Sequence, residues 1–182
     1  MKILMITGSP RRKGTSNTLA ARFEEGALAA GHTVERFDAA RAKVGGCKAC
    51  YYCRKHDGEC AQKDDMIPLL GEDGKIMSAD FIVFVTPLYY FGMSAQLKAV
   101  LDRFYALGRK LRERDQKAIL LATAGDDEEW VVGGLAEQFR DVCRWAHWQE
   151  AGMVLALGCH EVEQLTETSY PDDAYRLGAS LV

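Results

Sequence analysis

Several features are missing from this chain of 182 residues, and each absence excludes a class of protein. No apolar run approaches the roughly 18 residues that a membrane-spanning helix needs. The apolar run at the N-terminus covers only residues 3–6, which is too short for the core of a secretory signal peptide. There are also no internal repeats and no low-complexity linkers. We therefore expect a cytoplasmic protein, whose thiols are kept reduced.

Neither sign of charge dominates the composition. The chain has 23 Lys and Arg against 26 Asp and Glu, which gives a formal net charge of −3 at pH 7. A protein whose main partner is nucleic acid is usually basic, so we expect neither a nucleic-acid partner nor a membrane partner. The length suits one domain of ordinary size. We therefore predict a single domain over residues 1–182.

What the sequence does contain is an alternation of short apolar runs with segments whose apolar residues recur at helical spacing. Strands that alternate with helices predict an α/β fold, in which a five-stranded parallel sheet carries helices on both faces. In such sheets the ligand binds beside the loops at the carboxyl ends of the strands. The predicted strands are 2–7, 33–37, 80–86, 117–123 and 152–157. The predicted helices are 16–30, 64–70 with a continuation to 78, 95–107, 130–148 and a short one after Pro171.

The loop at residues 8–18 follows the first strand and leads directly into a helical pattern. Backbone N–H groups and the helix dipole at such a helix start attract anions. The loop contains hydroxyl and basic side chains, but Lys13 precedes Gly14, so it is not a Walker A motif. It also lacks the third glycine of the dinucleotide fingerprint. These features favour a phosphate monoester held without Mg²⁺, with a basic surface turn that binds nothing as the alternative.

Two further loops follow predicted strands. The loop at 86–94 places three adjacent aromatic residues between Pro87 and Gly92, and the loop at 122–127 is polar and contains Gly125. An apolar loop indicates a flat apolar ligand or a subunit interface, unless its rings pack in the core. A phosphate pocket, an aromatic wall and a polar edge together match FMN, which has a phosphate, an isoalloxazine ring and a ring edge rich in acceptors.

Three motifs within residues 1–125 carry a family resemblance: Gly8-Ser9-Pro10-Arg11 with Ser16-Asn17-Thr18, then Thr86-Pro87-Leu88-Tyr89, and Lys98 followed by Leu101-Asp102-Arg103. The set resembles the NAD(P)H-dependent FMN reductase group of flavodoxin-like proteins. The resemblance implies a flavodoxin-like fold, bound FMN, NAD(P)H as electron donor and a homodimer or homotetramer. It implies contacts of the FMN phosphate with Ser9, Arg11, Ser16, Asn17 and Thr18, of the ring with Pro87, Leu88, Tyr89, Tyr90 and Phe91, and further contacts with Thr123, Ala124 and Gly125. We interpret Lys98, Asp102 and Arg103 as structural charges on a helix near a subunit contact.

Four cysteines, Cys47, Cys50, Cys53 and Cys60, form a cysteine-rich insertion at about residues 45–62. A disulfide framework is not expected in a reducing compartment. Structural zinc usually takes two separated Cys-x2-Cys pairs, whereas three cysteines at successive x2 spacing plus a fourth suit a cubane cluster. The stretch, with Asp64-Asp65-Met66 after it, resembles the iron–sulfur flavoproteins of the same group, which implies a [4Fe–4S] cluster on these four cysteines. Zinc and free or redox-active thiols stay open as alternatives.

The predicted reaction depends on the cofactor, because the sequence offers no convincing pair of nucleophile and base. A flavin accepts a hydride at N5, while the protein supplies orientation and excludes solvent. We expect an FMN-dependent oxidoreductase that passes electrons from NAD(P)H to a quinone, a nitro or azo compound, free flavin or an iron–sulfur centre. The acceptor is thus a small molecule or a protein. One alternative is an FMN electron carrier, with or without a [4Fe–4S] cluster and without turnover of small molecules. Another is a redox or metal sensor that binds no flavin.

Overall fold

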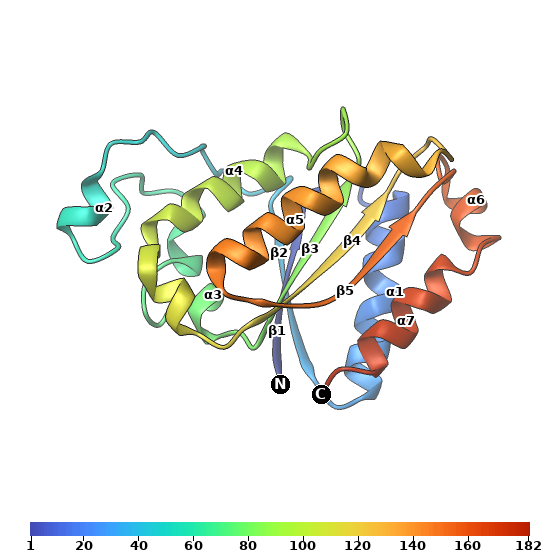
Figure 1. Cartoon of the computed structure of the whole chain (residues 1–182), viewed down its shortest axis with the longest axis horizontal. Coiled ribbons are helices and arrows are strands. Elements are labelled where there is room, and N and C mark those ends of the chain that lie inside the picture. Colours follow the sequence, from blue (N-terminus) through green and yellow to red (C-terminus); the bar gives the residue numbers. More distant parts are fainter.

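The computed structural model describes residues 1–182 and has a five-stranded parallel sheet between two layers of helices (Figure 1). The strand order is β2-β1-β3-β4-β5, and every neighbouring pair is parallel. The chain direction across the sheet reverses between β1 and β3, which makes this boundary the topological switch point where parallel sheets bind ligands. The strands are β1 (Lys2–Thr7), β2 (Thr33–Asp38), β3 (Phe81–Pro87), β4 (Lys117–Thr123) and β5 (Gln149–Ala156).

Side chains of the central strands alternate between two separate cores. On β1, Ile3 and Met5 pack with α1, α6 and α7, whereas Leu4 and Ile6 pack on the opposite face with α3, α4 and α5. Both faces of a central parallel strand are buried, so its sequence is apolar throughout. None of the helices has the length and hydropathy needed to span a membrane. The helices are α1 (Thr15–Ala29), α2 (Tyr52–Lys55), α3 (Lys75–Ser78), α4 (Ala95–Arg103), α5 (Gly133–Ala146), α6 (Val162–Thr166) and α7 (Tyr170–Ala179).

Two helix predictions need correction. The segment at 64–70 contains only a short 3-10 helix, Ile67–Leu69, because the carboxylate of Asp64 accepts hydrogen bonds from backbone N–H groups in place of a helical turn. The helix predicted over 130–148 is a 3-10 turn, Glu129–Val132, followed by α5. Its end comes at His147, whose left-handed backbone, with φ of 58°, ends the helix before Trp148.

Candidate functional site

The three predicted ligand loops meet at one edge of the sheet, beyond the carboxyl ends of β1, β3 and β4. They enclose a cleft of about 190 Å³, which we call the loop cleft. Eight of the thirteen residues assigned to FMN by resemblance line it. The lining residues are Ser9, Arg11, Gly14, Thr15, Ser16, Pro87, Leu88, Tyr89, Thr123, Gly125, Cys159 and His160.

The N-terminus of α1 faces this cleft without a cap of its own. Gly14 occupies the N-cap position and makes no side-chain cap, and the first turn contains no acidic residue. The first backbone N–H groups of a helix have no partner within the helix, so those of residues 15–17 remain available to a ligand. Asn17 and Thr18 instead hold the loop: Asn17 Nδ2 donates to the carbonyl of Arg11 at 2.8 Å, and Thr18 Oγ1 to that of Gly14 at 3.2 Å.

Hydroxyl groups join the first loop to the third. Ser16 Oγ lies 2.7 Å from Thr123 Oγ1, and Thr15 Oγ1 lies 3.1 Å from the same oxygen. Ser16, Ser9 and Thr123 are all buried. Hydroxyls can donate to the oxygens of a phosphate, which accept hydrogen bonds, and can donate to or accept from the hydroxyls of a polyol chain.

The loops after β1 and β3 are fixed to each other by buried hydrogen bonds. The Gly8 N–H donates to the Val85 carbonyl at 2.8 Å, and Ser94 Oγ donates to the Gly8 carbonyl at 2.9 Å. The Ser94 N–H donates in turn to Thr86 Oγ1 at 2.9 Å. A Cβ at Gly8 would lie 2.4 Å from Ser94 Oγ, so the position requires glycine. The floor of the loop cleft is therefore preformed.

The aromatic loop after β3 is a tight hairpin. Backbone hydrogen bonds join Tyr89 and Gly92 in both directions, at 3.0 and 3.1 Å, and the two central residues, Tyr90 and Phe91, have φ values of 45° and 64°. A left-handed backbone strains residues other than glycine, and such strain is concentrated at functional sites. Tyr89 lines the loop cleft. Tyr90 is 99% exposed and Phe91 stacks on Trp130, and neither residue lines the cleft.

The third loop brings two residues to the cleft that the sequence analysis did not assign. Ala124 is buried and pairs with the chain after β5: its carbonyl accepts the Cys159 N–H at 2.8 Å, which places Cys159 and His160 at the cleft. Burial raises the pKa of the Cys159 thiol, whereas His160 is exposed and lies 3.2 Å from a carboxylate oxygen of Glu161. Both residues could have been found from the sequence, because they follow a predicted strand of the parallel sheet, where such sheets bind ligands.

A second site candidate is the segment at residues 43–66, which we call the cysteine segment. It lies apart from the loop cleft, beyond the C-terminal end of α4, and includes α2 at the left of Figure 1. All four cysteine thiols are free and line one small hollow of about 20 Å³. No three His, Cys, Asp or Glu side chains lie close enough to one another to hold a metal ion in this structure.

Arg103 joins the cysteine segment to the helical layer. Its side chain is 1% exposed; Nη1 donates to Asp64 Oδ2 at 2.8 Å and to the Gly45 carbonyl at 2.9 Å, and Nη2 donates to Asp64 Oδ1 at 3.1 Å. The structural role expected of Arg103 agrees with this burial of its guanidinium beneath the segment, and the subunit contact expected near it stays a prediction. Burial opposes ionisation of Asp64, but hydrogen bonds from Arg103 and from backbone N–H groups outweigh it and lower the pKa of that carboxyl.

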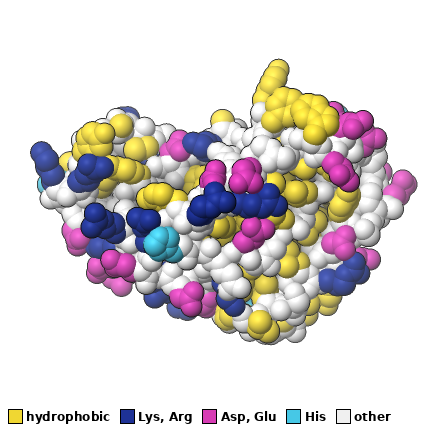
Figure 2. Space-filling model, viewed as in Figure 1, with side chains coloured by type: hydrophobic (Ala, Val, Ile, Leu, Met, Phe, Trp, Pro, Cys, Tyr) yellow, Lys and Arg dark blue, Asp and Glu magenta, His cyan; other side chains and the backbone are white.

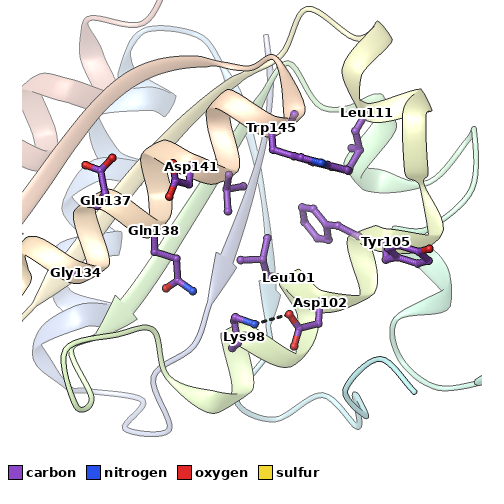
Figure 3. A pocket seen from close by; sticks show the side chains of 13 residues that line it. Lys98, Leu101, Asp102, Tyr105, Leu111, Gly134, Glu137, Gln138, Asp141 and Trp145 are labelled. Atoms are coloured by element: carbon purple, nitrogen blue, oxygen red, sulfur yellow. Dashed lines mark hydrogen bonds and ion pairs between the residues drawn. The ribbon is translucent and has the colours of Figure 1, made fainter. Parts of the chain in front are cut away.

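A larger cleft of about 610 Å³ separates α4 from α5 and contains no residue of the ligand loops. Figure 3 shows an ion pair between Lys98 and Asp102 along α4, with the Trp145 ring across the far end of the cleft near Leu111. The Lys98–Asp102 pair is exposed, unlike the neighbouring Arg103. This cleft therefore offers a mostly apolar surface bordered by charges.

The sequence profile of one family, described as NADPH-dependent FMN reductase, matches residues 1–160. The chain belongs to this family. The matched residues include the loop cleft and the four cysteines, and the flavodoxin-like fold predicted from the sequence is confirmed.

Two curated relatives and one solved structure show what this family member is similar to. An iron-sulfur flavoprotein of Archaeoglobus fulgidus is 42% identical over 108 residues, which cover 58% of this chain and 51% of the relative. An iron-sulfur flavoprotein of Methanosarcina thermophila is 31% identical over 147 residues, 81% of this chain and 73% of the relative. The solved structure of an NAD(P)H:quinone oxidoreductase from Methanothermobacter marburgensis superposes with a TM-score of 0.71 at 26% identity and covers 98% of this chain and 94% of that one. The chain spans about half the length of several curated relatives.

Proposed function

We propose that this protein is an oxidoreductase that passes electrons from NAD(P)H through bound FMN to a second acceptor. The observation that carries the proposal is the loop cleft, where the uncapped start of α1, a cluster of hydroxyls and an apolar wall meet at the switch point of the sheet. FMN supplies hydride and electron chemistry when it is bound. The protein's part is to bind it, orient it and exclude water.

The residues of the loop cleft fit the parts of FMN. The phosphate would accept hydrogen bonds from the first N–H groups of α1 and from Ser9 and Ser16, with the exposed guanidinium of Arg11 as counter-charge. Pro87, Leu88 and Tyr89 would cover the ring, while Thr123 and Gly125 border its polar edge. Asn17 and Thr18 would act on FMN indirectly, by holding the loop after β1 in place, and Ala124 would contribute through its backbone groups. Ring contacts of Tyr90 and Phe91 stay predictions.

The phosphate assignment is tested by comparing two ligands. Ser16→Ala and Arg11→Ala should weaken FMN about ten- to a hundredfold, because a lost hydrogen bond to a charged group costs about 1.5–3 kcal/mol. Riboflavin lacks the phosphate and should lose little affinity. Arg12→Ala is the matched control, since Arg12 is exposed and does not line the cleft. Equal losses for FMN and riboflavin would contradict the assignment.

Turnover separates the oxidoreductase from the electron carrier. NAD(P)H should bleach the bound flavin, and a quinone, a nitro or azo compound or free flavin should reoxidise it over many cycles. The measurement is NAD(P)H consumption with each acceptor, in wild type and in Ser16→Ala at equal flavin occupancy. If the bound flavin bleaches no faster with NAD(P)H than in buffer alone, the electron carrier is favoured.

For the cysteine segment, we propose that Cys47, Cys50, Cys53 and Cys60 hold a [4Fe–4S] cluster. Two observations support it: the four cysteines line one hollow, although their thiols would have to approach one another to ligate a metal, and several relatives are named iron-sulfur flavoproteins. Thiolates are the usual ligands of such clusters, which transfer single electrons. Anaerobically purified protein should contain about four irons per chain, and Cys50→Ala should lose them and keep FMN. Cys143→Ala, which alters a buried cysteine on α5, is the control.

We also propose that a second copy of the chain covers the cleft between α4 and α5. Support comes from its apolar lining with charges of both signs at its border, and from two further exposed rings, Phe91 and Trp130, on the protein surface. Trp145→Asp should shift sedimentation from dimer to monomer. Leu28→Asp is the matched control, because Leu28 is similarly exposed but lies on α1, in the opposite helical layer. An unchanged sedimentation coefficient in Trp145→Asp would contradict the interface.

A further inference from the structure

We propose that Arg103 is a positioning residue of the four-cysteine centre, and that its Nε–H donates a hydrogen bond to a sulfur of that centre. The inference rests on the proposed cluster and adds a residue that no cysteine pattern identifies. It concerns the one buried guanidinium of the chain, which lies where the cysteine segment meets α4.

The first observation is that Arg103 and all four cysteines line the same hollow. The two terminal nitrogens of the guanidinium are fully engaged with Asp64, with the Gly45 carbonyl and with the Gln62 carbonyl, the last at 3.3 Å. Asp64 thereby fixes the plane of the guanidinium. The remaining donor, Nε–H, is buried and has no hydrogen-bond partner.

A buried charged donor without a partner is destabilising, and native proteins contain few of them. The sulfur atoms of the hollow are the available acceptors. Cys53 and Cys60 are the half-buried cysteines of the segment and pack against the core beneath it, whereas Cys47 and Cys50 are exposed. The hollow therefore offers sulfur acceptors to the unpartnered Nε–H.

The contribution expected of Arg103 is a directed hydrogen bond more than a free charge. Asp64 already neutralises the guanidinium, so the pair adds little net charge to the hollow. Hydrogen bonds to the sulfurs are among the factors that set the potential of an iron–sulfur cluster, because they stabilise the more negative, reduced state. Removing Nε–H should therefore lower the reduction potential.

The test uses the full chain, purified anaerobically, and follows the cluster by redox titration. Arg103→Lys keeps the charge and loses Nε–H, so its potential should fall below that of wild type, as should that of Arg103→Gln. Asp64→Asn weakens the anchor but keeps the donor, and its potential should not fall. Arg109→Gln is the surface control, since Arg109 is exposed and makes no ion pair.

Hydrogen exchange of residues 43–66 in the metal-free protein reports the structural role separately, and both Arg103→Gln and Asp64→Asn should accelerate it. A potential of Arg103→Lys equal to that of wild type overturns the inference and leaves the proposed cluster intact. If a variant loses iron, its iron content is compared instead. Loss of iron from Arg103→Lys together with retention of iron in Asp64→Asn supports the inference. Equal loss of iron from both variants overturns it. Wild-type protein without iron overturns the cluster, and the inference with it.

Discussion

The loop cleft and the cysteine segment are built in opposite ways. The cleft stands on the ends of four parallel strands, and buried backbone and hydroxyl hydrogen bonds connect its loops, as between Gly8 and Ser94. The cysteine segment is mostly exposed and is fastened to the helical layer through Arg103 and Asp64. The comparison teaches that topology alone can form a site at a sheet edge, whereas an insertion depends on a few anchoring side chains.

Charge is unevenly distributed along the cysteine segment. Residues 43–63 carry five Lys or Arg against two Asp or Glu, and Asp64 and Asp65 follow them at the end of the segment, although acidic residues outnumber basic ones in the whole chain. Figure 2 shows Lys and Arg side chains gathered on the left of the molecule, around α2 and the segments beside it. A centre ligated by thiolates is anionic, and surrounding cations favour it. The mild net charge of the chain therefore conceals a basic stretch at residues 43–63.

The strongest test of the comparison is Asp64→Ala, which leaves Arg103 buried without its partner. Breaking a buried ion pair costs about 3–5 kcal/mol, so we expect residues 43–66 to loosen while the sheet stays folded. Hydrogen exchange resolved along the chain measures this, with the strand β1 as internal reference. Asp73→Ala is the control, because Asp73 is exposed and its side chain makes no hydrogen bond or ion pair. Global unfolding in place of local loosening would show that the two regions are one cooperative unit.

The next test compares a glycine in each region. A Cβ at Gly8 would lie 2.4 Å from Ser94 Oγ and 2.8 Å from Leu97 Cβ, whereas a Cβ at Gly46 meets nothing within 4 Å. Gly8→Ala should therefore lower the free energy of unfolding by about 1–3 kcal/mol and weaken FMN, as overpacking does. Gly46→Ala should change neither quantity. Urea denaturation and flavin titration measure both, and similar effects at the two positions would contradict a preformed cleft.

The aromatic hairpin after β3 gives a smaller effect, which raises the free energy of unfolding where the two substitutions above lower it. Tyr90 has a left-handed backbone and is 99% exposed, so Tyr90→Asn relieves strain without removing a contact. We expect the free energy of unfolding to rise by about 1 kcal/mol and the FMN affinity to stay unchanged. Tyr89→Ala, which alters the cleft wall, should weaken FMN instead. A loss of FMN in Tyr90→Asn would place its ring at the flavin after all.

The smallest effect is that of acid on the cysteine segment. The pKa of Asp64 is lowered in the folded protein, so its stabilisation is present above its unfolded pKa of about 3.9 and is lost as the pH falls through the folded value. Exchange of residues 43–66 should be constant from about pH 7 to 5, after correction for intrinsic rates, and should rise only below about pH 4. Asp64→Asn should lack this acid step, and loosening already at pH 6 would assign the transition to another group.

The fold was largely predictable, because each central strand is an apolar run bounded by turn residues. The strands at 2–7 and 117–123 have the predicted bounds, and the loop after each is where the sheet rules place a ligand. Helix ends were less predictable. His147 stops α5 through a left-handed backbone that no composition rule required, and Asp64 replaces a helical turn by side-chain hydrogen bonds.

Local sequence determined the elements, their order and the chemistry available at their ends: an uncapped helix start with hydroxyls after β1, aromatic residues after β3, and four thiols in one insertion. These are properties of neighbours in the chain. Only the tertiary structure decided which distant groups meet. It brought Thr123 to Ser16 and Cys159 with His160 to the cleft, turned Tyr90 away from it, and buried Arg103 beneath the cysteines. The reason is that burial and hydrogen-bond partners depend on how strands and helices pack, which periodicity along one segment does not specify.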